Sequence, residues 1–178
     1  MQNHFVRPRR SAAPLPREEE FAWKLAAVAA DDAPLDADVS AMIQNRIIDN
    51  AAVALASAAR PAIVNARAQA LAHPRGDGAV LFGLPQSRRV HAEWAAWANG
   101  IAVRELDYHD TFLLADYAHP GDSIPPILAV AQQCERSGAD ILRGIAAAYE
   151  IHIALVKSIC LHAHKIDHIA HTGPAAAA

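Results

Sequence analysis

Two segments of the 178-residue sequence hold side chains whose types and spacing suit proton transfer. The first, residues 105–122, interrupts apolar sequence with carboxylates, imidazoles and a hydroxyl. Histidine exchanges protons near neutral pH, and a carboxylate beside it can fix which ring nitrogen carries hydrogen. Spacing alone fits a capped, solvated loop equally well, so both interpretations stay open. The polar residues of this segment are Asp107, His109, Asp110, Thr111, Asp116, His119 and Asp122.

The second segment, residues 161–171, contains His162, His164, His168 and His171. Imidazole binds first-row transition metals, which raises the hypothesis of a metal-binding module. The spacings match no standard ligand pattern, and no cysteine joins them. We therefore expect no metal site and assign most of these histidines to loop or capping positions.

The elements around these segments are predicted to be mainly helical, because alanine, the strongest helix former, dominates the sequence. His152 lies in one apolar helical stretch, and we expect it to be a packing residue with satisfied hydrogen bonds. The Pro125-Pro126 pair opens one predicted helix and Asp140 caps the next. Helices are expected at residues 21 to about 31, about 38–59, 61–73, 88–100, 125–136 and 140–156, with another beginning at 172; residues 79–82 are the one predicted strand.

Composition describes a globular chain with a formal net charge of -3, which disfavours nucleic acid as a partner. No apolar run reaches the roughly 18 residues of a membrane span, so none is predicted. Residues 1–16 carry arginines and prolines without an apolar signal-peptide core, so we expect a flexible arm there and one domain over 17–178. Two cysteines are too few for a disulfide scaffold and fit a reducing, cytoplasmic location.

The sequence stops at Ala178 inside a predicted helix onset, without a C-cap glycine or a basic last turn. We therefore expect the chain to be the N-terminal portion of a longer protein, or a truncated product of one.

Four runs of the sequence resemble the MmgE/PrpD family, and the resemblance covers nearly the whole chain after about Arg17. One run carries the motif Asp107-x-x-Asp110-Thr111, followed downstream by His119-Pro120. The resemblance implies an all-α fold, namely the helical domain of this family in truncated form, without the smaller α/β lid domain. It also implies an active site between the two domains and a homodimer in the full-length form. The four runs are residues 92–111, 119–131, 148–151 and 159–171.

The resemblance is greatest to members that eliminate water from 2-methylcitrate in propionate catabolism, giving 2-methyl-cis-aconitate with no iron–sulfur cluster or other cofactor. Motif positions carried over from the family are Asp107, Thr111, His119 and His171. We expect His119 and His171 to transfer the two protons, without assigning which one is the acid. Asp107 is expected to orient a histidine or hold the substrate hydroxyl, and Thr111 to bind a substrate carboxylate.

A tricarboxylate substrate also requires cations, and Arg104 and Lys165 are the basic residues near the motifs, so both are substrate-binding candidates. Because so few cations are present, we expect this chain alone to dehydrate 2-methylcitrate weakly or not at all. Two alternatives stay open: a helical remnant without activity, or another lyase of the family, such as one resembling cis-aconitate decarboxylase.

Overall fold

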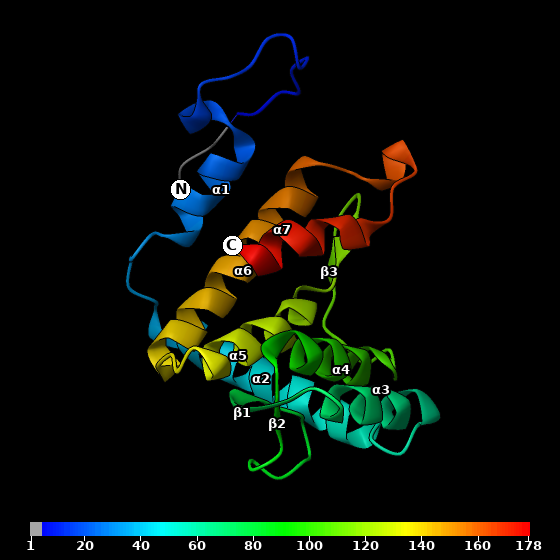
Figure 1. The fold of residues 1–178 in the computed structure, drawn as a ribbon. Helices are drawn as coiled ribbons and strands as arrows, with labels where there is room; N and C mark the ends of the chain where they lie inside the picture. Colours follow the sequence, from blue (N-terminus) through cyan, green and yellow to red (C-terminus); the bar gives the residue numbers. More distant parts are fainter. Residues whose placement is uncertain (1–4) are drawn as a thin grey trace.

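The computed structural model describes residues 5–178, and helices account for most of them (Figure 1). Short loops, 3-10 turns and two small antiparallel sheets connect the helices. This architecture confirms the predicted, mostly helical fold class. The α-helices are α1 (Phe21–Ala29), α2 (Ala37–Ala56), α3 (Pro61–Leu71), α4 (Ala92–Arg104), α5 (Ile124–Gln133), α6 (Gly138–Ser158) and α7 (Thr172–Ala177).

Helix α6 packs against α2 and α5 and also against α1 and α7 (Figure 1). Near its N-terminal end, Ile145 packs with Ile43 of α2 and Ile124 of α5. Toward its C-terminal end, Ile151 and Leu155 pack with α7 and with apolar side chains of α1. One long helix therefore carries two separate apolar clusters along its length.

A separate part of the core is built on small side chains of α4. Ala95, Ala98 and Ala102 are fully or almost fully buried and recur at helical spacing on one face. This face packs against α3, α5 and the first sheet. The alanine-rich composition thus allows α4 and its neighbouring helices to approach each other closely.

The start of α6 differs from the prediction that Asp140 is its cap. Ser137 is the N-cap residue, and its hydroxyl accepts a hydrogen bond from the Asp140 N–H at 3.2 Å. The Asp140 carboxylate in turn accepts from the Ser137 N–H at 3.0 Å. Asp140 is therefore the third residue of the helix, and its carboxylate completes the capping box by accepting from the N-cap backbone.

The prediction of a single strand at residues 79–82 was wrong in number and position. β1 (Pro74–Val80) pairs with β2 (Arg89–Val90), and β3 (Phe112–Leu113) pairs with β4 (Tyr117–Ala118), both antiparallel. Three of these strands are two residues long, which is too short to show an alternating pattern. β1 begins at a proline and contains two glycines, which weaken a strand signal.

Helix α4 begins and ends later than the predicted 88–100, because residues 89–90 pair in β2. The shift places Arg104 in the last turn of α4, next to the polar segment. The histidine-rich segment, predicted to be irregular, contains the 3-10 turns η3 (His162–His164) and η4 (His168–His171).

A ring stack joins β1 to α4. The imidazole of His73, directly before β1, lies parallel to the Trp94 indole with ring centroids 3.9 Å apart. The Trp97 ring meets Trp94 edge-on at 5.7 Å. Trp94 thus contributes to packing, while Trp97 remains partly exposed.

At the N-terminus, residues 1–4 of the predicted arm lie outside the described residues, and residues 5–16 contain neither helix nor strand. The 3-10 turn η1 (Arg17–Glu19) then leads into α1. Over residues 5–178, no single helix is long and apolar enough to span a membrane; α2 and α3, bent by 105°, meet that test only as a pair, by length and composition.

Candidate active site

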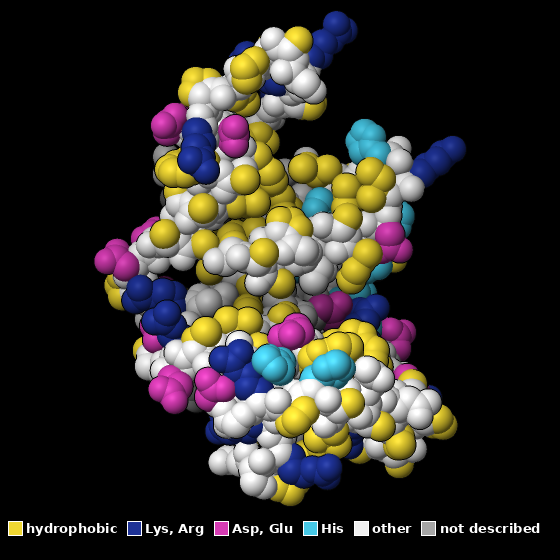
Figure 2. All heavy atoms as spheres, in the orientation of Figure 1, with side chains coloured by type: hydrophobic (Ala, Val, Ile, Leu, Met, Phe, Trp, Pro, Cys, Tyr) yellow, Lys and Arg dark blue, Asp and Glu magenta, His cyan; other side chains and the backbone are white. Residues whose placement is uncertain are grey.

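The two polar segments meet where the β3–β4 hairpin and the 3-10 turn η2 (Pro120–Ser123) pack against α6 and η4. Figure 2 shows histidine side chains along the side of the molecule where Figure 1 places β3 and the segment before α7. Sequence-distant imidazoles and carboxylates therefore share one region.

His119, the last residue before η2, has a fixed ring orientation. Its Nδ1 lies 2.9 Å from the backbone carbonyl oxygen of Asp110 and 3.3 Å from the Thr111 hydroxyl. A carbonyl oxygen only accepts hydrogen bonds, so Nδ1 carries the hydrogen and Nε2 is the basic nitrogen of the neutral ring. The predicted pair of Thr111 and His119 is thus brought together, with Thr111 beside the imidazole.

Hydrogen bonds to the carboxylate of Asp110 fix the position of this residue beside His119. Its carboxylate accepts a hydrogen bond from the Tyr149 hydroxyl at 2.6 Å and another from the Gly121 N–H at 2.8 Å. A Cβ atom at position 121 would lie 2.6 Å from Asp110 Oδ1, so only glycine fits there. Burial raises the pKa of the Tyr149 hydroxyl, and the negative charge of Asp110 raises it further. Tyr149 therefore stays protonated as a donor.

Arg104 connects the end of α4 to this cluster. One guanidinium nitrogen lies 2.8 Å from His109 Nε2 and 3.3 Å from Asp122 Oδ2. Burial lowers the pKa of His109, and the charge of Arg104 lowers it further. Burial raises the pKa of Asp122, while Arg104 opposes that shift. The shift for His109 favours its neutral ring, and the shift for Asp122 makes its carboxylate a stronger base than an exposed one.

His168 of η4 faces the same cluster. Its ring centroid is 5.4 Å from that of His119 and 4.1 Å from that of Tyr117. Nδ1 lies 3.1 Å from a carboxylate oxygen of Asp167. That approach lacks hydrogen-bond geometry, and neither ring nitrogen has a partner within residues 5–178. Burial lowers the pKa of His168, which favours a neutral ring.

The other predicted site residues are placed differently. His171 is buried, and its Nε2 lies 3.1 Å from the carbonyl oxygen of Ile159. Asp107 is exposed, with a carboxylate oxygen 3.5 Å from His109 Nε2. Lys165 is exposed at the end of η3 in a left-handed conformation. The structure therefore brings Arg104, Thr111 and His119 into the cluster, Asp107 to its edge, and gives His171 and Lys165 no contact with His119 among its hydrogen bonds and ring contacts.

His152 on α6 was expected to be a satisfied packing residue, and half of that expectation was wrong. The side chain is completely buried, but neither ring nitrogen has a hydrogen-bond partner among the described residues. Burial, with a smaller effect from the nearby histidines His171 and His168, lowers its pKa to about 4. Helical periodicity identifies such a residue as buried, but it does not reveal what its ring faces.

Sequence reasoning named His168 and Asp110 within the polar segments but assigned neither to the site, and it gave Tyr149 no role. Asp110 lies within the motif quoted for the family, so its position was a usable signal. Tyr149 contacts Asp110 from a helix 39 positions away, and no local pattern marks it. Across residues 5–178, no group of three or more histidine, cysteine or acidic residues is arranged to hold a metal ion.

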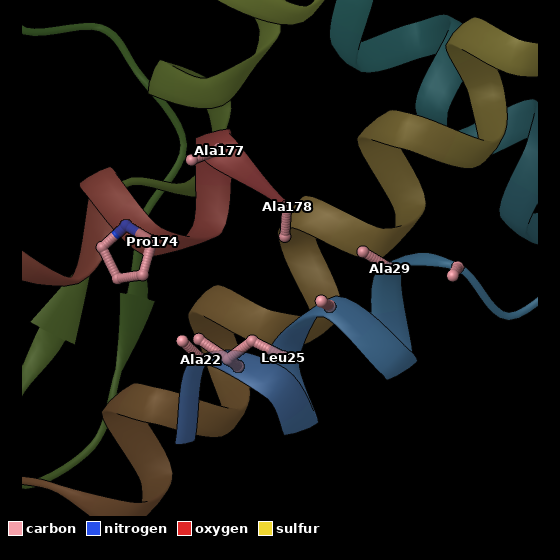
Figure 3. Close-up of a pocket in the computed structure, with 8 residues that line it drawn as sticks. Ala22, Leu25, Ala29, Pro174, Ala177 and Ala178 are labelled. Atoms are coloured by element: carbon pink, nitrogen blue, oxygen red, sulfur yellow. The ribbon is translucent and has the colours of Figure 1, made fainter. Parts of the chain in front are cut away.

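An apolar groove of about 430 Å³ lies elsewhere, between α1 and α7 (Figure 3). It has no titratable side chain in its lining and therefore no means of proton transfer. Its lining residues are Ala22, Leu25, Ala26, Ala29, Ala30, Pro174, Ala177 and Ala178.

The described residues form a helical domain in which imidazoles and carboxylates gather beside α6. The chain belongs to the MmgE/PrpD family, because the family model of the MmgE/PrpD N-terminal domain matches residues 19–178.

Curated relatives are similar over part of the chain. The 2-methylcitrate dehydratase of Salmonella typhimurium is 29% identical over 85 residues, which is 42% of this chain and 18% of the relative. The mitochondrial 2-methylcitrate dehydratase of Yarrowia lipolytica is 32% identical over 81 residues, 39% of this chain and 16% of the relative. A probable 2-methylcitrate dehydratase of Saccharomyces cerevisiae is 30% identical over 87 residues, 42% of this chain and 17% of the relative. The matched stretch is thus less than a fifth of each relative's length.

Proposed function

We propose that the chain contributes acid–base residues to a lyase that eliminates water from a tricarboxylate of the 2-methylcitrate class. Family membership and the partial similarity to 2-methylcitrate dehydratases support a lyase of this kind. The position of the cluster at the junction of α6, η2 and η4 supports the same proposal.

One observation carries the proposal: buried polar atoms without hydrogen-bond partners within residues 5–178 gather around His119. Native proteins leave few such atoms unpaired, so a concentration of them indicates a place completed by a polar ligand or water. Asn50 reaches this region as well, because its side-chain nitrogen would lie 3.2 Å from a Cβ at position 121. The atoms are Asn50 Oδ1, His109 Nδ1, Asp122 Oδ1, Ser123 Oγ and both ring nitrogens of His152 and His168.

The chemistry requires one base and one acid. The base removes a proton from carbon, the C–H electron pair becomes the new double bond, and the hydroxyl leaves as water after protonation by the acid. His119 supplies one role through Nε2, which forms no hydrogen bond with any described residue. We assign His168 to the other role because its ring adjoins His119. The sequence-based assignment to His171 is the alternative.

A second candidate function is substrate binding without turnover. One guanidinium nitrogen of Arg104 already contacts His109 and Asp122, and the carboxylate of Asp122 offsets part of its positive charge. Lys165 is exposed, and it forms no ion pair with any residue between 5 and 178. With few uncommitted cations beside the cluster, weak binding without turnover is the outcome expected of the chain if the acid–base assignment fails.

The test is to measure both binding and turnover with the purified chain. Calorimetry with citrate and with 2-methylcitrate measures binding, and the ultraviolet absorbance of the unsaturated product measures turnover. Turnover supports the lyase function, and binding without turnover supports the second candidate. Absence of both contradicts the proposal. His164→Gln, an exposed histidine change, serves as the control for unspecific effects.

A further inference from the structure

A second imidazole–carboxylate pair lies next to the proposed site. Asp116, at the turn of the β3–β4 hairpin, has a side chain with no exposed surface. Its carboxylate accepts hydrogen bonds from the Tyr117 N–H at 2.8 Å and from the Leu161 N–H at 2.7 Å. A third contact joins Asp116 Oδ1 to Nδ1 of His162 at 2.7 Å. A buried carboxylate remains charged only when bonded in this way.

The charge on Asp116 determines which nitrogen of His162 is basic. Burial raises the pKa of Asp116, but its hydrogen bonds outweigh burial and lower the pKa to about 2. An ionised carboxylate only accepts, so the hydrogen lies on Nδ1 of His162 and Nε2 holds the free lone pair. The His162 side chain is 49% exposed, and no described residue bonds to Nε2. This leaves a basic nitrogen open to solvent.

The ring of His162 is close to the proposed proton-transfer pair. It stacks on Tyr117 with centroids 5.2 Å apart, and its centroid is 6.3 Å from that of His168. Tyr117 in turn lies against both His168 and His119. The titratable and charged groups facing His162 are therefore Asp116 and Tyr117 of the hairpin and His168 of η4.

We propose that Asp116 and His162 form a relay that returns protons between the base and the acid after each elimination. The relay rests on the proposed function. Elimination leaves the base with one extra proton and the acid lacking one, while the substrate loses only water. Nε2 of His162 accepts a proton from the base through solvent and returns it to the acid, and Asp116 stabilises the intermediate imidazolium. No proton is gained or lost over the cycle.

The first test determines the tautomer and needs no turnover. In ¹⁵N NMR spectra of the labelled chain, neutral His162 should carry its hydrogen on Nδ1, and Asp116→Asn should abolish that preference. An Nε2-protonated ring, or an equal mixture, would overturn the pair. If Asp116→Asn does not fold, the tautomer of His162 in the wild-type chain still decides the question.

The second test measures kcat in dilute buffer that contains no imidazole. His162→Gln should lower kcat by about 10-fold, and added imidazole should restore it, since a diffusible base replaces the relay. His164→Gln changes a neighbouring histidine of the same turn and should match the wild type. Equal rates for the two variants, or a loss that imidazole does not restore, would overturn the relay. A wild-type chain that neither binds nor converts 2-methylcitrate would instead overturn the proposed function, together with the relay that depends on it.

Discussion

At the scale of single residues, two histidines compete for the role opposite His119. His168 has two unpartnered ring nitrogens beside His119, whereas His171 Nε2 lies within bonding distance of the Ile159 carbonyl oxygen. We expect His168→Gln to lower kcat for 2-methylcitrate by about 100-fold, because general acid–base catalysis contributes about that much. Steady-state turnover measures this effect.

The matched variant for that prediction is His171→Gln, which changes a buried histidine three residues away. It should alter folding stability more than kcat, because its ring closes a contact within the protein. A large kcat loss in His171→Gln, with near wild-type rates in His168→Gln, would reverse the assignment in favour of the sequence-based one.

Sequence reasoning identified the polar segments because composition and motif spacing are local properties. It identified His119 and Thr111, which the structure places within hydrogen-bonding distance of each other. It assigned His171 from the family motif, and it could not tell that the ring of His168 adjoins His119, because the contacts of both histidines depend on how η4 packs against β4 and α6. Side-chain direction in short turns is set by tertiary contacts, so no window of sequence reveals it.

At the scale of elements, the turn η2 depends on a glycine. Gly121→Ala places a Cβ 2.6 Å from Asp110 Oδ1, so Asp110 must move away from Tyr149 and from the η2 backbone. We expect this variant to lose about 1–3 kcal/mol of unfolding free energy, as overpacked positions do. It should also lower kcat, because the Asp110 carbonyl orients His119. Urea denaturation followed by circular dichroism measures the stability change.

Gly100→Ala is the control for this experiment. Gly100 lies inside α4 with nothing within 4 Å of an added Cβ, so alanine there should stabilise the helix by up to about 1 kcal/mol. If both glycine variants behave alike, the crowding at position 121 is not the cause of the loss.

The elements themselves show where prediction succeeds. Long helices such as α2 and α6 were located from apolar periodicity and proline or glycine boundaries. The two-residue strands β2, β3 and β4 were not, because they form only where another segment supplies hydrogen-bond partners. The β3–β4 hairpin, which carries Asp116 and Tyr117, is therefore a product of tertiary structure.

At the scale of the whole molecule, the buried histidine His152 makes folding sensitive to acid. Its pKa falls from an ordinary value of 6.5 to about 4 in the folded chain. Between these values the unfolded chain binds the proton and the folded chain does not, so stability falls as pH falls through that window. The shift corresponds to at most about 3 kcal/mol lost by pH 4.

Replacing His152 with leucine, which cannot be protonated, tests this prediction. Denaturation midpoints measured from pH 7 to pH 4 should fall less steeply for His152→Leu than for the wild type, with the curves diverging below about pH 6.5. The pKa values of His109 and His168 are also lowered, so these two residues contribute to the pH dependence of stability in both proteins. Parallel curves would show that another group dominates acid unfolding.

The stack of His73 on Trp94 makes the fluorescence of Trp94 sensitive to the folding of the chain. An imidazole in contact with an indole quenches its fluorescence. Emission from Trp94 should therefore be quenched while the chain stays folded, and should rise when unfolding separates β1 from α4. Because this stack lies outside the His119 cluster, Trp94 fluorescence reports the packing of β1 against α4, and substitutions of His119 or His168 should leave it unchanged.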